Sequence, residues 1–395
     1  MEHKKNVLIV HNYYQQPGGE DTVVANEMKL LKDHGHKVYL YTRNNSEIKT
    51  YSIIQKLGMC FNTFFSIKTY HEVRDIIIKE KIDILHVHNT LNLISPSVYY
   101  AGFSCQIPVI QTMHNFRLLC PAATFYRDGH ICENCISRGI MCSIKNKCYR
   151  NSRIQTIASV MNLILHKSLG SYRRVNFICL TEFNKDKLLY LNSGRKEIID
   201  ESRVYIKPNF TFDVIKKQNI NQEDYYVFVG RLEEIKGTKV LLKAFKENKK
   251  KLLIIGDGEQ RNTIEKYISY HKLQNITMTG QVSHDQVNDI VQKAKALIVP
   301  SQWYETFGMV IIEAYANSVP VIAGNIGNIG MLVDNGETGC IFKYNSWKSL
   351  NRILERIEIY NSMQLKEKSY QTFCDKYSEE SNYTILKGIY ENVRK

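Results

Sequence analysis

Short apolar runs separated by amphipathic segments recur along the whole chain. A run such as Val7–Val10, with no polar position, is typical of a strand buried on both faces of a parallel sheet. The first half contains such runs at residues 7–10, 37–42, 82–88, 108–112 and 177–180, and the second half at 225–231, 252–256, 276–280, 296–300 and 320–323. The alternation of these strands with helical segments predicts doubly wound α/β architecture.

A polar stretch divides the two series of strands. The strand at residues 203–206 ends near Lys207-Pro208, and the chain then stays polar as far as Asp224. Because 395 residues exceed the size of one ordinary core, two domains are expected. We therefore predict a first domain over residues 1–208 and a second domain from residue 209 onward.

The helix that follows residues 296–299 offers a site for an anion. A polar, aromatic loop leads into this helix near Phe307, and the free backbone N–H groups of a helix start favour a diphosphate. Glu305 precedes the helix, and Glu313 lies about 7–8 Å along it from Gly308. That spacing is about the separation of a diphosphate from the ribose of the same nucleotide. An ordinary helix-end charge plus one solvated glutamate is the alternative.

Glycine-flanked loops supply two further candidates. Arg231 and Lys236 lie in the loop from Gly230 to Gly237, where two cations at a sheet edge would neutralise a diphosphate leaving group. Either cation alone is more often a solvated surface charge. Gly18-Gly19 at the start of a helix lets backbone approach a ligand closely, unless it is a plain loop with a glycine cap.

These motifs together resemble one family of enzymes. The motifs are Gly18-Gly19-Glu20, His114, Gly230-Arg231, Lys236-Gly237, Pro300-Ser301, Glu305-Thr306-Phe307-Gly308 and Glu313-Ala314, in that order along nearly the whole chain. They resemble the retaining glycosyltransferases of family 4, which have the GT-B fold. The resemblance implies two Rossmann-like domains facing each other across a cleft. It also implies that the second domain ends near residue 377 and that a helix over 378–395 returns to the first.

The resemblance assigns the donor's diphosphate to the second domain. Arg231 and Lys236 would hold it, and the N–H groups of Thr306, Phe307 and Gly308 would assist them. The cations and the helix dipole would replace a divalent ion, so no metal is expected in catalysis. Trp303 and Tyr304 precede Glu305, and Thr306 stands where the family often has proline; these departures leave the donor sugar undetermined.

Further residues of the nucleotide sugar's site follow from the same resemblance. Glu313 would bond the ribose hydroxyls, backbone near Gly280 and Gln281 would meet the base, and Glu305 would stabilise the donor sugar. In the family's mechanism the leaving phosphate deprotonates the acceptor hydroxyl, which attacks the sugar from the same face. The anomeric configuration is therefore retained.

In the first domain, the resemblance gives roles to three residues. Gly18 and Gly19 would let the backbone approach the phosphate, and His114 would contact the sugar ring. We therefore expect His114 and Glu305 to be the catalytic residues. The acceptor would bind chiefly to this first domain.

A cysteine-rich insertion follows His114. Residues 117–150 contain Cys132-x-x-Cys135, a spacing typical of metal ligands, and Cys120 with Cys148 would complete a tetrahedral zinc site. A loop of reduced cysteines is the alternative. The cations of this insertion indicate an acceptor that carries phosphate.

Net charge and apolar composition limit the partners. A net charge of +14 favours nucleic acid, anionic lipid or phosphorylated substrates. No apolar run reaches the roughly 18 residues of a spanning helix, so we expect a cytoplasmic protein without a signal peptide. Residues 51–71 and 161–174 are apolar and basic without an acidic residue. They would lie on the inner face of an anionic membrane, or else pack as core helices.

The sequence therefore predicts a glycosyltransferase of bacterial capsule, O-antigen or exopolysaccharide synthesis, with a UDP- or GDP-sugar donor and a lipid-linked or saccharide acceptor. A zinc-stapled nucleic-acid-binding protein is a second reading, but the basic residues are spread over the chain rather than gathered with aromatic residues. A GT-B sugar-nucleotide epimerase or phosphorylase is a third.

Overall fold

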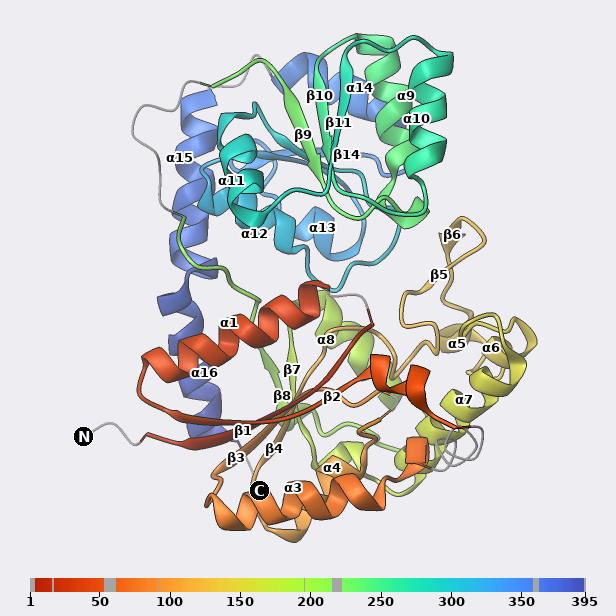
Figure 1. Ribbon diagram of the computed structural model, residues 1–395, viewed down its shortest axis with the longest axis vertical. Helices are drawn as coiled ribbons and strands as arrows, with labels where there is room; N and C mark the ends of the chain where they lie inside the picture. Colours follow the sequence, from red (N-terminus) through yellow and green to blue (C-terminus); the bar gives the residue numbers. More distant parts are fainter. Residues whose placement is uncertain are drawn as a thin grey trace. The chain divides into compact units, whose positions relative to one another are not determined.

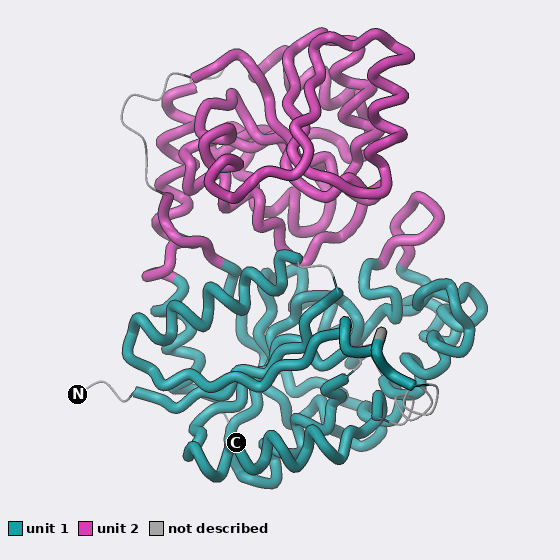
Figure 2. The backbone as a smooth tube through the Cα atoms, in the orientation of Figure 1, with its two compact units in different colours: residues 1–124, 133–209, 382–395 teal, residues 125–132, 210–381 magenta. Residues whose placement is uncertain are grey.

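The chain forms two compact units (Figure 2). The computed structural model describes residues 4–15, 18–52, 62–91, 93–194, 196–214, 222–357 and 362–393. Unit 1 comprises Met1–Thr124, Glu133–Asn209 and Asn382–Lys395, and unit 2 comprises Phe125–Cys132 and Phe210–Ser381. The chain therefore passes between the units four times.

The cysteine-rich insertion is divided between the units, which corrects its assignment to the first domain alone. Its hairpin, β5 (Tyr126–Arg127) and β6 (His130–Ile131), belongs to unit 2. Phe125 at the base of this hairpin is fully buried, and its ring lies edge-on to Tyr304 with centroids 6.2 Å apart. The apolar contact of one aromatic residue thus explains why this segment groups with unit 2.

Unit 1 is built on a six-stranded sheet whose order is β2-β1-β3-β4-β7-β8. Its strands are β1 (Asn6–Tyr13), β2 (Lys37–Asn44), β3 (Ile84–Asn89), β4 (Val109–Thr112), β7 (Asn176–Cys179) and β8 (Val204–Ile206). All neighbouring strands are parallel. The order reverses between β1 and β3, which is where such sheets bind ligands.

Helices cover both faces of this sheet (Figure 1). The helical segments of unit 1 are α1 (Gly19–Asp33), η1 (Asn45–Thr50), α3 (Ile67–Lys79), α4 (Ser97–Ser104), α5 (Asn134–Ser137), α6 (Cys142–Lys145), α7 (Arg153–Ser168), η2 (Tyr172–Arg174), α8 (Glu182–Leu189), η3 (Tyr190–Asn192), η4 (Glu201–Arg203) and α16 (Glu379–Asn392). Leu386 and Ile389 of α16 share an apolar cluster with Val24 of α1 and Ile9 of β1. On the other face, α3 and α4 pack against the sheet and form a second apolar cluster with it. The C-terminal helix therefore completes the core of unit 1.

Unit 2 has a second parallel sheet with the order β11-β10-β9-β12-β13-β14. Its strands are β9 (Tyr226–Val229), β10 (Leu252–Ile255), β11 (Ile276–Gly280), β12 (Leu297–Val299), β13 (Val321–Gly324) and β14 (Gly339–Phe342). This is the order of dinucleotide-binding sheets, and it reverses between β9 and β12. The predicted doubly wound architecture is confirmed in both units.

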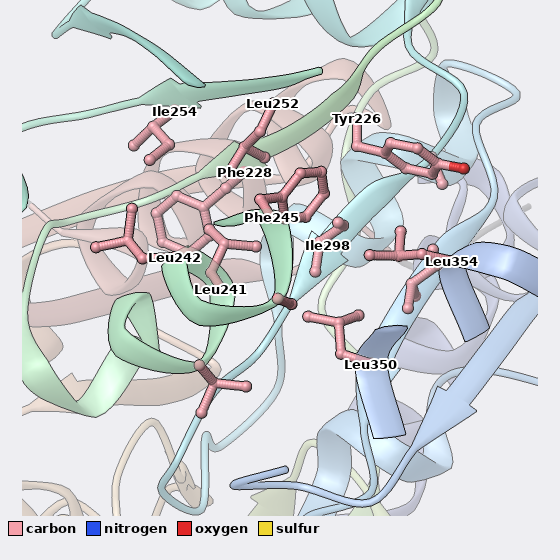
Figure 3. Packing of buried hydrophobic residues seen from close by; sticks show 14 of the residues in the cluster. Tyr226, Phe228, Leu241, Leu242, Phe245, Leu252, Ile254, Ile298, Leu350 and Leu354 are labelled. Atoms are coloured by element: carbon pink, nitrogen blue, oxygen red, sulfur yellow. The ribbon is translucent and has the colours of Figure 1, made fainter. Parts of the chain in front are cut away.

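The core of unit 2 lies between its sheet and several of its helices (Figure 3). Its helical segments are η5 (Glu234–Lys236), α9 (Thr238–Asn248), α10 (Arg261–Tyr270), α11 (His284–Lys293), α12 (Met309–Ala316), α13 (Gly327–Met331), α14 (Trp347–Arg356), α15 (Ser362–Thr372) and η7 (Phe373–Tyr377). Phe245 of α9 and Leu350 of α14 pack with Ile254 and Ile298 of the sheet. Because this packing holds the strands in place, it also sets the positions at which the loops after the strands begin.

None of the described helices is long and apolar enough to cross a membrane. Of the apolar, basic stretch at 51–71, residues 53–61 lie outside the described part of the chain. The stretch at 161–174 forms the second half of α7 and the turn after it.

Candidate functional site

Two loops of unit 2 meet where its strand order reverses. Residues 230–237 follow β9, residues 300–308 follow β12, and these two strands are neighbours. The N–H of Gln302 donates a hydrogen bond of 2.8 Å to the carbonyl of Ile235, which ties the loops together. The Arg231–Lys236 segment is thus fixed beside the segment that contains Glu305.

Glycines allow backbone to pack directly on backbone at this edge. Gly237 has φ +78°, and a Cβ there would lie 1.8 Å from the carbonyl oxygen of Pro300. Gly256, which follows β10, has φ +136°, and its Cβ would lie 2.0 Å from the carbonyl oxygen of Gly230. Any larger residue would push the loops apart, so the sequence enforces close approach here.

Lys236 and Glu305 form an ion pair between the two loops. The Lys236 Nζ lies 2.9 Å from Glu305 Oε1, and the hydroxyl of Ser301 donates to the same oxygen. Burial alone would raise the pKa of Glu305, but the charge of Lys236 and these hydrogen bonds outweigh it and lower that pKa. The side chains remain 20% and 12% exposed. Glu305 is therefore a fixed carboxylate with some surface left for a ligand.

Arg231 does not share this pair. Its Nη1 lies 3.0 Å from Glu233 Oε1, and its side chain is 58% exposed. Both cations that were predicted to hold a diphosphate thus have a carboxylate partner in this structure. Arg231 is exposed enough to exchange Glu233 for a more highly charged anion.

Asn328 supports the segment around Glu305 and was missed by the sequence analysis. Its Nδ2 donates to the carbonyls of Glu305 and Thr306 at 2.7 and 2.9 Å, and its side chain is fully buried. Gly327-Asn328 after β13 was the available signal, because it follows a strand end as the other motifs do. Ser301 was named only as part of a motif.

Helix α12 begins directly after Phe307 and Gly308. Phe307 is buried, and Gly308 is the residue before the first turn. Glu313 lies on this helix, and burial raises its pKa, which nearby His284 partly offsets. A carboxylate at this position can accept hydrogen bonds from hydroxyl groups.

Gly280 and Gln281 lie farther along the same edge. Gly280 ends β11, the outermost strand, and its carbonyl accepts a hydrogen bond of 2.9 Å from the N–H of Gly256. Gln281 is exposed in the next position. The edge therefore continues from the ion pair toward the outermost strand along a backbone lined by glycine.

In unit 1, the start of α1 is occupied by its own carboxylates. The N–H of Gly18 donates to Asp21 Oδ2 at 2.9 Å, and Asp21 Oδ1 lies 2.8 Å from Nε2 of buried His11. Gly19 is the first residue of the helix. Burial raises the pKa of Glu20 to about 8, against a smaller opposing hydrogen bond from Tyr14. A phosphate at this helix end would meet Glu20 and Asp21.

His114 follows β4 and pairs with a histidine of β3. His114 Nε2 lies 2.8 Å from His88 Nδ1, and the two rings are stacked. Burial, together with the charge of neighbouring histidines, lowers the pKa of both rings, that of His88 to about 4. His114 is therefore a neutral imidazole.

A buried glutamate, absent from the sequence analysis, lies behind these histidines. Glu27 Oε1 is 3.4 Å from His88 Nε2 and 3.0 Å from His86 Nδ1, and its Oε2 is 2.9 Å from Lys207 Nζ. A carboxylate can only accept, so it favours the His88 tautomer protonated at Nε2. His88 Nδ1 then accepts from His114 Nε2–H, which leaves His114 Nδ1 as an acceptor nitrogen.

The predicted zinc ligands are not gathered in the same way. In the described part of the chain, one group of three metal-ligand atoms lies within 4.8 Å of one another, and it consists of Glu27, His86 and His88. The predicted thiols are Cys120, which is buried, and Cys132, Cys135 and Cys148, which are partly exposed. Cys132 belongs to unit 2 and the others to unit 1. Zinc stays a prediction.

Comparison with known proteins answers the question of family. Residues 17–137 match the model described as Glycosyltransferase Family 4, and residues 211–372 match the model of glycosyl transferases group 1. The two matches together cover most of both units. The chain belongs to glycosyltransferase family 4. This confirms the predicted family, and the two parallel α/β units have the predicted GT-B fold.

Relatives match this family 4 glycosyltransferase over nearly its full length. An uncharacterized glycosyltransferase of Methanocaldococcus jannaschii is 26% identical over 98% of both chains. The alpha-monoglucosyldiacylglycerol synthase of Streptococcus pneumoniae is 22% identical over 98% of this chain and 86% of its own. The Anabaena protein HepE, crystallised with UDP-glucose, has a TM-score of 0.65 at 15% identity and covers 98% of this chain and 100% of its own. The enzyme is thus a glycosyltransferase.

Proposed function

We propose that this glycosyltransferase transfers a hexose from a UDP- or GDP-sugar to a lipid-linked or saccharide acceptor, with retention of anomeric configuration. The observation that carries the proposal is the Lys236–Glu305 pair, held at the strand reversal of unit 2 beside the start of α12. A reversal of this kind is where doubly wound sheets hold nucleotides. The UDP-glucose crystallised with HepE supports a nucleotide sugar as the donor.

The charges of unit 2 suit a diphosphate leaving group. Arg231 and Lys236 supply positive charge, and the N–H groups of Thr306, Phe307 and Gly308 precede α12. In the proposed step, the bond from sugar C1 to the diphosphate oxygen breaks, and a bond from C1 to the acceptor oxygen forms on the same face. The acceptor's hydroxyl proton passes to the leaving diphosphate. No divalent ion is required for this charge balance.

The carboxylate of Glu305 stabilises the positive charge that develops on the sugar. Lys236 and Ser301 keep it ionised, as the lowered pKa indicates. Glu313 takes the ribose, and backbone near Gly280 and Gln281 takes the base. His114 stays a predicted catalytic residue on the acceptor side of the reaction.

The pathway and the location belong to the same proposal. We place the enzyme in bacterial capsule, O-antigen or exopolysaccharide synthesis, peripheral on the cytoplasmic face of the membrane. A relative named for a glucosyldiacylglycerol product supports an acceptor at a membrane. Family membership favours transfer over the nucleic-acid-binding alternative, and no observation favours the epimerase.

Nucleotide binding tests the donor site directly. UDP, GDP and their glucose conjugates should raise the melting temperature of the protein, and Lys236→Ala should abolish most of that shift. Lys239→Ala is the matched control, because Lys239 is an exposed lysine at the start of α9. Absence of any shift with all four compounds, or equal loss in both variants, would refute the assignment.

A further inference from the structure

Unit 1 contains a cavity beside His114 to which no role has been assigned. Its volume is about 430 Å³, and it is lined by residues of β3, β4, α4 and α7 and of the insertion. His88 and His114 form part of its wall. Much of the remaining lining is apolar and comes from Leu91, Leu118, Ile154, Ala158 and Leu163. A cavity of this size can hold one end of a substrate.

The charges of this cavity are all of one sign. Arg117 and Arg150 line it, and none of its other lining residues in the described part of the chain is an aspartate or a glutamate. Both guanidinium groups lie over the ring of Tyr149, with Cζ atoms 5.3 and 5.4 Å from its centroid. Stacking on one ring restrains both cations. Two restrained guanidinium groups with forked donors are suited to a phosphate, which they can bind in a bidentate manner.

Helix α7 forms one wall of the cavity and presents an apolar face to solvent. Its inward positions include Thr156, Val160 and Leu163. The outward residues are Ile154, Ile157, Met161, Ile164, Leu165 and, just after the helix, Leu169, with exposed fractions from 38% to 76%. These positions recur at helical spacing and form one stripe. An uninterrupted exposed apolar stripe of this length marks a binding surface.

The part of the chain that contains this stripe is strongly basic in sequence. Between residues 134 and 181 the chain has no acidic residue, and its cations are Arg138, Lys145, Lys147, Arg150, Arg153, Lys167, Arg173 and Arg174. An amphipathic helix with this charge complements an anionic lipid surface, into which its apolar face inserts. Ile154 joins the two features, because it lines the cavity and is 76% exposed at the first turn of the stripe.

We propose that the cavity binds the acceptor and that the acceptor is a phosphorylated lipid. Its phosphate pairs with Arg117 and Arg150, and its reacting end lies toward His114. Its apolar chain leaves past Ile154 along α7, whose outward stripe lies in an anionic membrane surface. This inference rests on the proposed glycosyl transfer and names the chemical class of its acceptor.

Calorimetric titration with farnesyl phosphate tests the cavity. Farnesyl phosphate should bind at least roughly tenfold more tightly than inorganic phosphate or farnesol, because it alone offers both charge and chain. Arg117→Gln with Arg150→Gln should remove most of that difference, whereas the exposed Arg138→Gln control should keep it. Equal affinity for glucose 1-phosphate would indicate a water-soluble phosphorylated acceptor and overturn the proposal. No binding of farnesyl phosphate would also overturn it.

Vesicle sedimentation tests the outward stripe. The protein should bind vesicles of phosphatidylcholine with 30 mol% phosphatidylglycerol, and Ile157→Asp with Ile164→Asp should lower the bound fraction several-fold. Ile78→Asp is the matched control on α3, since Ile78 is 55% exposed. Equal losses in stripe and control variants, or equal binding to phosphatidylcholine alone, would contradict the assignment.

A nucleotide readout separates this proposal from the one on which it rests. The Arg117→Gln, Arg150→Gln protein should keep the full UDP-induced melting shift, because both residues belong to unit 1 and the donor site to unit 2. A wild-type protein that binds farnesyl phosphate but no nucleotide would sink the donor proposal alone. A protein that binds nucleotide but not farnesyl phosphate would sink the acceptor proposal alone.

Discussion

The two units use the same architecture to make opposite kinds of site. In unit 2, the reversal between β9 and β12 has an exposed arginine, an ion pair that keeps some exposed surface, and a backbone edge lined by glycine. In unit 1, the reversal between β1 and β3 has neutral histidines backed by Glu27 and Lys207, both fully buried. An edge built from loops adapts to a ligand, whereas buried charges fix one arrangement of side chains before any ligand arrives.

Removal of Glu27 should have the largest effect on stability, because it removes the carboxylate of the buried ion pair in unit 1. Glu27→Ala leaves the Lys207 ammonium uncompensated in the core and should cost about 3–5 kcal/mol in the free energy of unfolding. Urea denaturation measures this loss. The double variant Glu27→Met, Lys207→Met should recover most of it, and failure to recover would show that the pair is not the cause.

The pH dependence of stability should be the next largest effect and should also come from unit 1. The folded pKa of His88 is about 4, below its ordinary value of 6.5, so the unfolded chain binds more protons between these values. Stability should therefore fall as pH drops from about 6.5 to 4, by on the order of 3 kcal/mol. His88→Gln should remove this contribution and reduce the slope in that window, whereas His11 and His114, whose pKa values are also lowered, keep theirs. The exposed control His71→Gln should not reduce the slope, and an equal effect there would reject the explanation.

Substitution of Gly237 tests the close contact between the two loops of unit 2. Gly237→Ala places a Cβ 1.8 Å from the carbonyl oxygen of Pro300 at a positive φ, and should cost about 1–3 kcal/mol. It should also remove the UDP-induced melting shift, since the two loops can no longer meet. Gly388→Ala in α16 is the control, because no atom lies within 4 Å of its added Cβ. A normal melting shift in Gly237→Ala would mean that close loop contact is not needed for nucleotide binding.

The two glutamates of unit 2 should show the smallest effects on stability and a clear division of function. Glu313→Ala should weaken nucleotide binding and raise KM for the donor, whereas Glu305→Gln should mainly lower kcat. Both should unfold within about 1 kcal/mol of the parent, because neither carboxylate is fully enclosed. Steady-state kinetics with calorimetry separates the two roles, and equal loss of nucleotide affinity in both variants would contradict the division.

The sequence predicted the parts of the molecule that depend on local pattern. Apolar runs identified the strands, and motifs at strand ends indicated that the loops of Lys236 and Glu305 would lie together, as the structure places them. It did not reveal Glu27. In the sequence this residue resembles any glutamate of a helix, and its role depends on contacts between α1 and β3. Lys207 was treated only as part of a linker, and it is the partner of Glu27. Such pairs arise from contacts across 180 residues, for which a single sequence has no periodic signal.

The division of the cysteine-rich insertion has a consequence for recombination between relatives. Because residues 125–132 group with unit 2, a chimera joined only at the crossings after Asn209 and Ser381 would exchange Tyr304 without Phe125. The new Tyr304 position would then face a hairpin inherited from another parent. A functional exchange of unit 2 must therefore carry residues 125–132 as well as residues 210–381. The hairpin of the insertion must therefore come from the same parent as the rest of unit 2, although each unit has a complete sheet of its own.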